Sequence, residues 1–207
     1  MGGVGEDGGW ADGPRVLEEL RSGLATLPRH TIDWPTAVPA AVLVPLFLRG
    51  DELRLVFTER SAHLRSHSGQ ISFPGGKCDD GDADAVATAI READEELGID
   101  PTSVHVLGIL DDVPTPSGFL IAPVVALLNP APGCYRPNRA EVAEVFEVPI
   151  STIADRTVFE EQGVVERFGF KFQVYSYHVV GKRIWGATAR MVHQLLGARS
   201  ITPRSGH

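Results

Sequence analysis

The chain has 207 residues, and 19 Lys and Arg against 27 Asp and Glu give it a formal net charge of −8. This length predicts one compact domain, and two cysteines are too few for a disulfide framework, which favours a cytoplasmic location. The hydrophobic content of 43% excludes a disordered chain, the acidic balance disfavours a stable nucleic-acid partner, and no apolar run approaches the ~18 residues of a membrane-spanning helix.

Two flexible tails are expected to flank the domain. Residues 1–12 are rich in glycine and contain almost nothing to bury, and residues 198–207 follow the last apolar pattern. The domain is therefore expected to span residues 13–197. Its first helix is predicted over residues 14–27, because Asp12 is a good N-cap and leucines recur behind it at helical spacing.

Strand patterns dominate the centre of the chain. Residues 40–48 are typical of a buried strand, and residues 53–59 are typical of its hairpin partner. Further β-rich runs cover residues 70–76, 103–110, 119–128, 164–170 and 172–180. Two helical patterns interrupt them, over residues 84–97 with a stop at Gly98 and over residues 185–197 with a stop at Gly197. This order predicts an α/β (α+β) fold in which helices cover a mixed central β-sheet.

The predicted helix over residues 84–97 carries clustered carboxylates. Glu92, Glu95 and Glu96 lie three and four residues apart, so they are neighbours on the helix surface. Because such carboxylates repel each other, they indicate a hard divalent cation such as Mg²⁺, which takes oxygen ligands. Arg91 lies four residues before Glu95 and is expected to pair with it. The alternative interpretation is a solvated acidic face beside the core.

A strand end and a Pro-Gly-Gly turn precede this helix, and glycines there let a ligand approach the backbone closely. The stretch over residues 75–99 resembles the Nudix box, the loop-helix signature of the Nudix hydrolases. Its tail is matched by Arg91, Glu92, Ala93, Glu95, Glu96, Gly98 and Ile99. At ordinary residue frequencies the five fixed positions would coincide about once in a million starting points.

The front half of the box departs from the usual pattern. Arg91 follows Gly76 by one residue more than in the general box, and the early glutamate is missing. Asp82 holds its place counting forward from Gly76, whereas Ala83 holds it counting back from Arg91. This departure leaves open whether any early acid has a role.

A second motif points to one branch of the family. The segment over residues 56–76 resembles the extra motif of the coenzyme A diphosphatases, with every spacing matched. The positions that match are Val56, Phe57, Thr58, Arg60, Ser61, Arg65, Gly69, Phe73, Pro74, Gly75 and Gly76. Arg60 and Arg65 present planar donor forks suited to phosphate, with pairing to local acids such as Glu59 as the alternative.

The resemblance implies an α/β/α sandwich and metal-dependent hydrolysis of the pyrophosphate of coenzyme A to 3′,5′-ADP and 4′-phosphopantetheine. It implies that Mg²⁺ or Mn²⁺ is held by Glu92 and Glu96, with Glu95 as a third ligand or the base. Arg91 and Glu144, or Glu141 beside it, are the other catalytic candidates. The implied substrate-binding residues are Arg60, Arg65, Gly69, Phe73, Pro74, Gly75, Gly76 and Lys77.

Two other functions remain open. The box recognises metal and pyrophosphate, so NADH, ADP-ribose, oxidised nucleotides and capped RNA ends are alternative substrates. A Nudix-fold binding module without catalysis is the third hypothesis, although such modules typically lose box acids that this chain retains. Homodimers are common in the family, so a homodimer is a further expectation, although the sequence shows no self-complementary patch.

Overall fold

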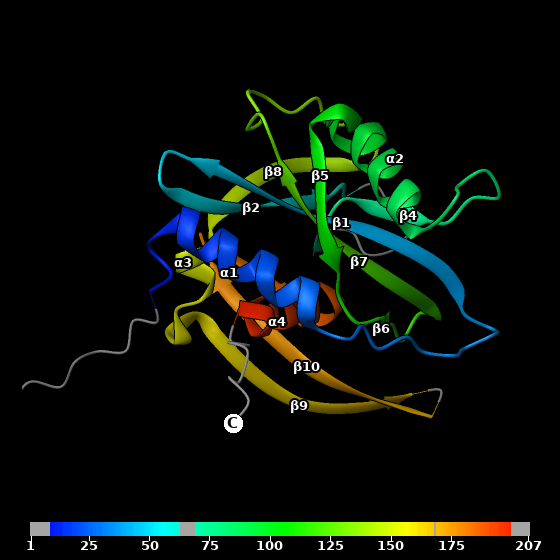
Figure 1. The fold of residues 1–207 in the computed structure, drawn as a ribbon. Coiled ribbons are helices and arrows are strands. Elements are labelled where there is room, and N and C mark those ends of the chain that lie inside the picture. Colours follow the sequence, from blue (N-terminus) through cyan, green and yellow to red (C-terminus); the bar gives the residue numbers. More distant parts are fainter. Residues whose placement is uncertain (1–8, 63–68, 168, 200–207) are drawn as a thin grey trace, which may run out of the picture.

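The computed structural model describes residues 9–62, 69–167 and 169–199 (Figure 1). The α-helices in these ranges are α1 (Gly13–Thr26), α2 (Ala85–Leu97), α3 (Ile150–Ile153) and α4 (Gly186–Arg199). The strands are β1 (Val38–Arg49), β2 (Glu52–Arg60), β3 (Ile71–Ser72), β4 (Gly75–Lys77), β5 (Val104–Ile109), β6 (Val113–Pro114), β7 (Phe119–Leu128), β8 (Val142–Pro149), β9 (Phe159–Arg167), β10 (Phe170–Val179) and β11 (Lys182–Trp185). Short 3₁₀ turns cover Pro101–Ser103 and Arg156–Val158.

Strand β1 organises the main sheet. It forms a tight hairpin with β2, in which Arg49 faces Glu52, and the turn uses Gly50 at a φ of 61°. On its other side β1 pairs in parallel with β7, from Val38 opposite Phe119 onwards. The sheet order is β3-β2-β1-β7-β5, with β4 paired to β1, β6 to β7 and β8 to β2. The predicted mixed central sheet is therefore confirmed.

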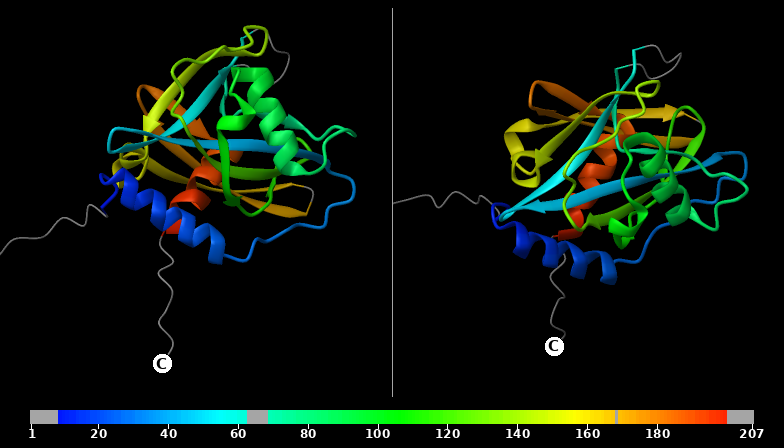
Figure 2. Two further views of the ribbon diagram at one scale, coloured as in Figure 1. Left: turned by 45° about the horizontal axis from the view of Figure 1, so that its top comes forward. Right: turned by 90° about the horizontal axis from the view of Figure 1, so that it is seen from above.

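Helices cover both faces of this sheet (Figures 1 and 2). Helix α2 buries Ala89, Ala93 and Leu97 on one face, in a cluster with side chains of β1 and β7. Helices α1 and α4 lie on the other face, where Leu20 and Leu195 belong to a second apolar cluster. A separate three-stranded sheet, ordered β11-β10-β9, covers that second cluster. The predicted fold class is confirmed, while this second sheet was not predicted as a separate layer.

Residues at the two ends of the described chain contact each other, and the last helix is longer than predicted. Trp10, in the predicted tail, has the guanidinium carbon of Arg199 4.1 Å from the centre of its ring. The Arg199 guanidinium also donates to the Gly9 carbonyl at 3.0 Å. Helix α4 does not stop at Gly197 but continues to Arg199, because Ala198 is buried where α4 crosses α1. At that crossing a side chain on Gly23 would overlap the Ala198 carbonyl, so glycine allows the close approach.

The first predicted helix is confirmed. Asp12 caps α1 by accepting a hydrogen bond from the Arg15 amide at 3.1 Å, and the leucines of the helix face the core. Among the helices in the described part of the chain, none has the length and apolar character that crossing a membrane requires.

Candidate active site

Helix α2 and the turn before it form the centre of the candidate site. The helix begins after Asp84, whose carboxylate accepts from the Ala87 amide at 2.9 Å. It ends at Gly98, which adopts the left-handed conformation with a φ of 64°. These are the boundaries that the sequence predicts, and they follow from ordinary helix capping. The apolar face of α2 packs on the sheet, which leaves its glutamates along the edge that faces β4 and the end of β2.

Glu92 and Glu96 lie against the Pro-Gly-Gly turn. Glu96 is only 4% exposed and accepts a hydrogen bond from the backbone of Gly75. Gly76 has Glu92 directly above it, so a Cβ at this position would overlap the Glu92 carboxylate. Gly75 in turn packs against Val42 of β1. The turn therefore contains glycines because carboxylates and a neighbouring strand occupy the space that side chains would need.

The electrostatic environment disfavours the ionised form of both carboxylates. Burial raises the pKa of Glu96 to about 8, with further increases from Glu141 and Glu92 and an opposing effect of Arg60. Burial also raises the pKa of Glu92, which Arg91 opposes and the negative charges of Glu95 and Glu141 reinforce. The carboxylate oxygens of Glu92 and Glu96 thus lie close together where solvent is partly excluded, and a bound cation would relieve their repulsion.

Arg91, predicted to be catalytic, holds the loop to the helix. Its Nε donates to Asp82 Oδ1 at 3.0 Å and its Nη2 to Asp82 Oδ2 at 2.9 Å, a two-pronged pair. It also contacts Glu92 Oε1 at 3.0 Å and Glu95 Oε2 at 3.3 Å. The expected pairing with Glu95 is therefore present, and Arg91 braces the site instead of facing the Glu96 carboxylate. Hydrogen bonding to Arg91 lowers the pKa of Asp82.

Asp82 is the early acid that the sequence left in doubt. The longer loop brings it to Arg91 even though the spacing differs from the general box. Thr88 and the Asp79 backbone also donate to its carboxylate, at 2.8 and 3.0 Å. Glu95 is 59% exposed and shares Arg91 Nη1 with Glu92. Its role as a third metal ligand or as the base stays a prediction.

Arg60 and Glu141 are the charged residues outside α2 whose charges act on Glu96. Arg60 is the last residue of β2, and its Nε is buried without a hydrogen-bond partner among the described residues. The Ser61 amide donates to the Glu141 carbonyl at 2.7 Å, which ties the two segments together. The charges of Arg60 and Glu141 both act on the pKa of Glu96, which places both side chains in its electrostatic environment. Gly69 has a φ of 70°, and Arg65 lies outside the described residues.

Glu144, the first choice as general base, lies elsewhere. Along β8 it points to the same face as Phe146, which belongs to the cluster beneath α1 and α4. Its carboxylate accepts from Lys182 Nζ at 2.8 Å. Helix α2 covers the opposite face, where Val145 packs. The sequence did not reveal this because a bulge in the pairing of β2 with β8 changes the alternation of side chains just before Glu144.

Three residues predicted to bind substrate have other surroundings. Phe73 is buried and stacks on Phe57, with ring centroids 4.8 Å apart. The Pro74 carbonyl accepts from the Leu43 amide at 2.9 Å and joins the turn to β1. Lys77 is exposed, with its ammonium 5.9 Å from the centre of the Phe119 ring. The first two build the core beneath the turn, and only Lys77 is free to extend into solvent.

The loop after β7 caps α2. The Asn138 amide donates to the Glu96 carbonyl at 2.8 Å, and Arg136 donates likewise to Leu97 at 2.7 Å. The loop then delivers Glu141, whose amide donates to the Asn138 carbonyl at 3.0 Å. The last turn of α2 therefore positions Glu141 beside the carboxylates that the helix carries.

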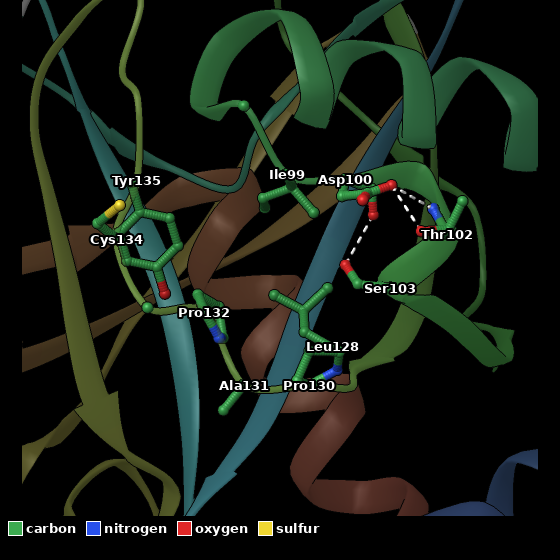
Figure 3. Close-up of a pocket in the computed structure, with 12 residues that line it drawn as sticks. Ile99, Asp100, Thr102, Ser103, Leu128, Pro130, Ala131, Pro132, Cys134 and Tyr135 are labelled. Carbon is green, nitrogen blue, oxygen red and sulfur yellow. Dashed lines mark hydrogen bonds between the residues drawn. The ribbon is translucent and has the colours of Figure 1, made fainter.

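A cavity of about 240 Å³ lies between this loop and the end of α2 (Figure 3). Figure 3 shows Pro132 and Tyr135 across the cavity from Asp100 and Ser103. Asp100 is already engaged, because its carboxylate accepts from Thr102 at 2.8 Å. None of the predicted site residues lines the cavity. It is therefore separate from the carboxylate cluster.

The donor set fits a divalent ion held by two carboxylates. Among the residues that the structure describes, no three His, Cys, Asp or Glu side chains are gathered closely enough to form a complete cage. Mg²⁺ does not need one, because it keeps several waters and is usually held by one or two carboxylates together with substrate phosphates. Glu92 and Glu96, one helical turn apart beside the glycine turn, are the pair that meets this requirement.

A mixed sheet lies between helices, and the helix that follows the glycine turn carries Glu92 and Glu96 beside that turn. The NUDIX domain family matches residues 38–168. A relative from Photorhabdus laumondii is 43% identical over 75% of this chain and 82% of its own length. One from Escherichia coli K12 is 38% identical over 79% of this chain and 84% of its own length. Both are named Uncharacterized Nudix hydrolase NudL. This chain belongs to the Nudix hydrolase family and acts on diphosphate bonds.

The fold is also similar to that of a solved structure. A MutT/nudix family protein from Enterococcus faecalis superposes with a TM-score of 0.50 over 95% of this chain and 74% of its own, at 12% identity. At that identity the likeness concerns the fold alone.

Proposed function

We propose that this Nudix hydrolase is a coenzyme A diphosphatase, which splits coenzyme A into 3′,5′-ADP and 4′-phosphopantetheine. The observation that carries the proposal is the motif over residues 56–76, which resembles that of the coenzyme A diphosphatases. Its support from the structure is Arg60, the last residue of β2, whose charge lowers the pKa of Glu96. An arginine beside the carboxylate pair suits a substrate with several phosphates.

Glu92 and Glu96 are proposed to hold Mg²⁺ or Mn²⁺. The bound ion would neutralise the diphosphate oxygens and lower the pKa of the attacking water. Arg91 and Asp82 keep Glu92 in place, because Arg91 contacts both carboxylates at 3.0 Å or less. The Gly75 amide fixes Glu96 in the same way from the turn. These contacts orient the ligands before substrate arrives, which lowers the reorganisation needed for catalysis.

Glu141 is proposed as the general base. Its charge acts on both Glu92 and Glu96 from a separate loop, its backbone is held by Ser61 and Asn138, and its carboxylate accepts from Asn138 Nδ2 at 3.3 Å. A base in this position removes a proton from the water molecule as that water attacks phosphorus. Arg60 donates to a phosphate oxygen and offsets the charge that develops there. Lys77, exposed beside the turn, is a further candidate for phosphate contact, whereas Arg65 stays a prediction.

A substrate panel tests the proposal. The purified chain with Mg²⁺ is offered coenzyme A, NADH, ADP-ribose, 8-oxo-dGTP and capped RNA at equal concentration, and products are separated by chromatography. We expect the highest kcat/KM with coenzyme A. A preference of tenfold or more for any other member would replace coenzyme A as the substrate, while the family assignment would stand.

Arg60→Lys tests the phosphate contact. Lysine keeps the charge but loses the planar fork, so KM for coenzyme A should rise about tenfold while kcat changes less. Arg190→Lys is the matched control, because this arginine lies on α4 outside the candidate site. An unchanged KM in Arg60→Lys would remove Arg60 from the substrate site. The homodimer and the cytoplasmic location stay predictions.

A further inference from the structure

Two glutamates face each other where the site joins the main sheet. Glu59 on β2 is directly opposite Glu144 on β8, immediately before the pairing shifts and Arg60 meets Val142. Like charges directly opposite each other destabilise a strand pair. A bulge interrupts the regular pairing immediately beyond this pair.

Lys182, from the second sheet, holds both carboxylates. Its Nζ lies 2.6 Å from Glu59 Oε2 and 2.8 Å from Glu144 Oε2. The ammonium also lies 5.1 Å from the centre of the Phe146 ring, and the side chain is only 21% exposed. Hydrogen bonds to Glu144 and then Glu59 raise the pKa of Lys182, so it stays charged at neutral pH.

The clasped strands continue into the candidate site. Arg60 follows Glu59 directly, and the Ser61 amide donates to the Glu141 carbonyl at 2.7 Å. The charges of Arg60 and Glu141 both act on the pKa of Glu96 from outside α2. Separation of β2 from β8 at Glu59 and Glu144 would therefore move both groups relative to the helix.

The turn that carries Lys182 is strained. β10 and β11 are joined by two residues, Val180 and Gly181, both with positive φ, at 46° and 73°. A β-branched residue rarely adopts this conformation, and Val180 is also 59% exposed, so its side chain gains little from packing. Strained backbone that persists in a fold often serves to position a functional group. Here it places Lys182 directly after the turn.

We propose that Lys182 is a positioning residue of the hydrolase: it clasps Glu59 and Glu144 and so keeps Arg60 and Glu141 aimed at the α2 carboxylates. The inference rests on the proposed function for its kinetic readout. Lys182 itself touches neither substrate nor metal in this scheme. Lys182 acts through the paired ends of β2 and β8. Its effect depends on the repulsion between Glu59 and Glu144, which the lysine relieves.

The test compares Lys182→Met with Lys182→Arg and with the double variant Lys182→Met/Glu144→Gln. In the single variant Glu59 and Glu144 repel each other without a cation between them. Because even a small displacement of catalytic groups slows a reaction, kcat/KM for coenzyme A should fall about tenfold or more. The arginine variant keeps the clasp and should stay within about threefold of wild type. The double variant no longer contains the repulsion and should recover to a similar level. Lys171→Met, on the exposed part of β10, is the control and should behave as wild type.

A second readout does not depend on turnover. Mn²⁺ affinity, measured by electron paramagnetic resonance without substrate, should weaken about threefold in Lys182→Met, because displacement of Glu141 moves its negative charge away from the Glu92–Glu96 pair. Loss of a positive charge without displacement would instead strengthen Mn²⁺ binding. If the wild type hydrolyses no diphosphate, the proposed function fails and Mn²⁺ affinity alone decides this inference.

Several outcomes would overturn the inference. Wild-type kcat/KM and Mn²⁺ affinity in Lys182→Met, with only a lower melting temperature, would reduce Lys182 to a structural contact. A double variant as impaired as the single one would show that repulsion between Glu59 and Glu144 is not the cause. All kinetics are measured at a temperature where circular dichroism shows each variant fully folded.

Discussion

Replacing Glu96 by glutamine should weaken the loss of stability with rising pH in the metal-free protein. Glu96 is 4% exposed, and burial raises its pKa from the ordinary 4.5 to about 8. Between these two values the folded state holds a proton that the unfolded state releases. The free energy of unfolding must therefore decrease as the pH rises through this range. Glutamine has no charge to bury and escapes this penalty.

The size of the effect follows from the pKa. A tenfold change in proton affinity corresponds to about 1.4 kcal/mol, so raising the pH from 5 to 8 should remove about 3 kcal/mol through Glu96. For a domain of about 200 residues, this corresponds to a fall in melting temperature of roughly 6–12 °C. Glu92 contributes with the same sign, since burial raises its pKa as well.

The assay is urea unfolding of wild type and Glu96→Gln in EDTA at pH 5, 6, 7 and 8. The difference between the two proteins is the quantity of interest. Burial lowers the pKa of His193, which has the opposite effect on stability, but this histidine is present in both proteins and cancels. Asp94→Asn removes an exposed acid from the same helix and should follow the wild type at every pH.

The reasoning would be refuted if wild type and Glu96→Gln changed in parallel with pH. A constant difference would mean that Glu96 ionises in the fold as it does in water. Adding Mg²⁺ at pH 8 gives a second comparison, because an ion that binds only the native state stabilises it. The wild type should then gain more stability than Glu96→Gln.

Substitutions in two turns give further predictions. Gly76→Ala should lower kcat/KM for the diphosphate substrate about tenfold or more, because the new Cβ displaces Glu92, whereas Gly81→Ala, in open space, should not. Wild-type kinetics in Gly76→Ala would refute the close approach. Val180→Asn should raise the free energy of unfolding by about 0.5–1 kcal/mol in urea, because asparagine tolerates the positive φ of the turn. A loss of stability there would show that valine is not strained.

Local patterns were sufficient for most of the fold. Helix α1 follows from an N-cap and spaced leucines, and the β1–β2 hairpin follows from apolar runs around a glycine turn. These features depend on neighbours within a few residues. The end of α4 was missed because Ala198 is buried against Gly23, which is distant in sequence. Helix propensity alone favours a stop at Gly197.

In the candidate site too, residues set by local spacing could be predicted, whereas residues set by contacts between distant segments could not. Glu92 and Glu96 could be found because helical spacing places them together. Asp82 could not be assigned by counting, because the longer loop still reaches Arg91 through a bidentate pair. Glu144 was misplaced because a bulge in a pairing between distant segments decides its direction. Lys182 has no local signal at all, since its partners are 123 and 38 residues away.

The most direct test of the whole account is the digestion of coenzyme A in H₂¹⁸O with Mg²⁺, followed by mass spectrometry of the products. We expect 3′,5′-ADP and 4′-phosphopantetheine, with one ¹⁸O in a single product. Glu96→Gln should lose nearly all of this activity, while Asp94→Asn on the same helix retains it. Intact coenzyme A after digestion by the wild type, or full activity in Glu96→Gln, would contradict the account.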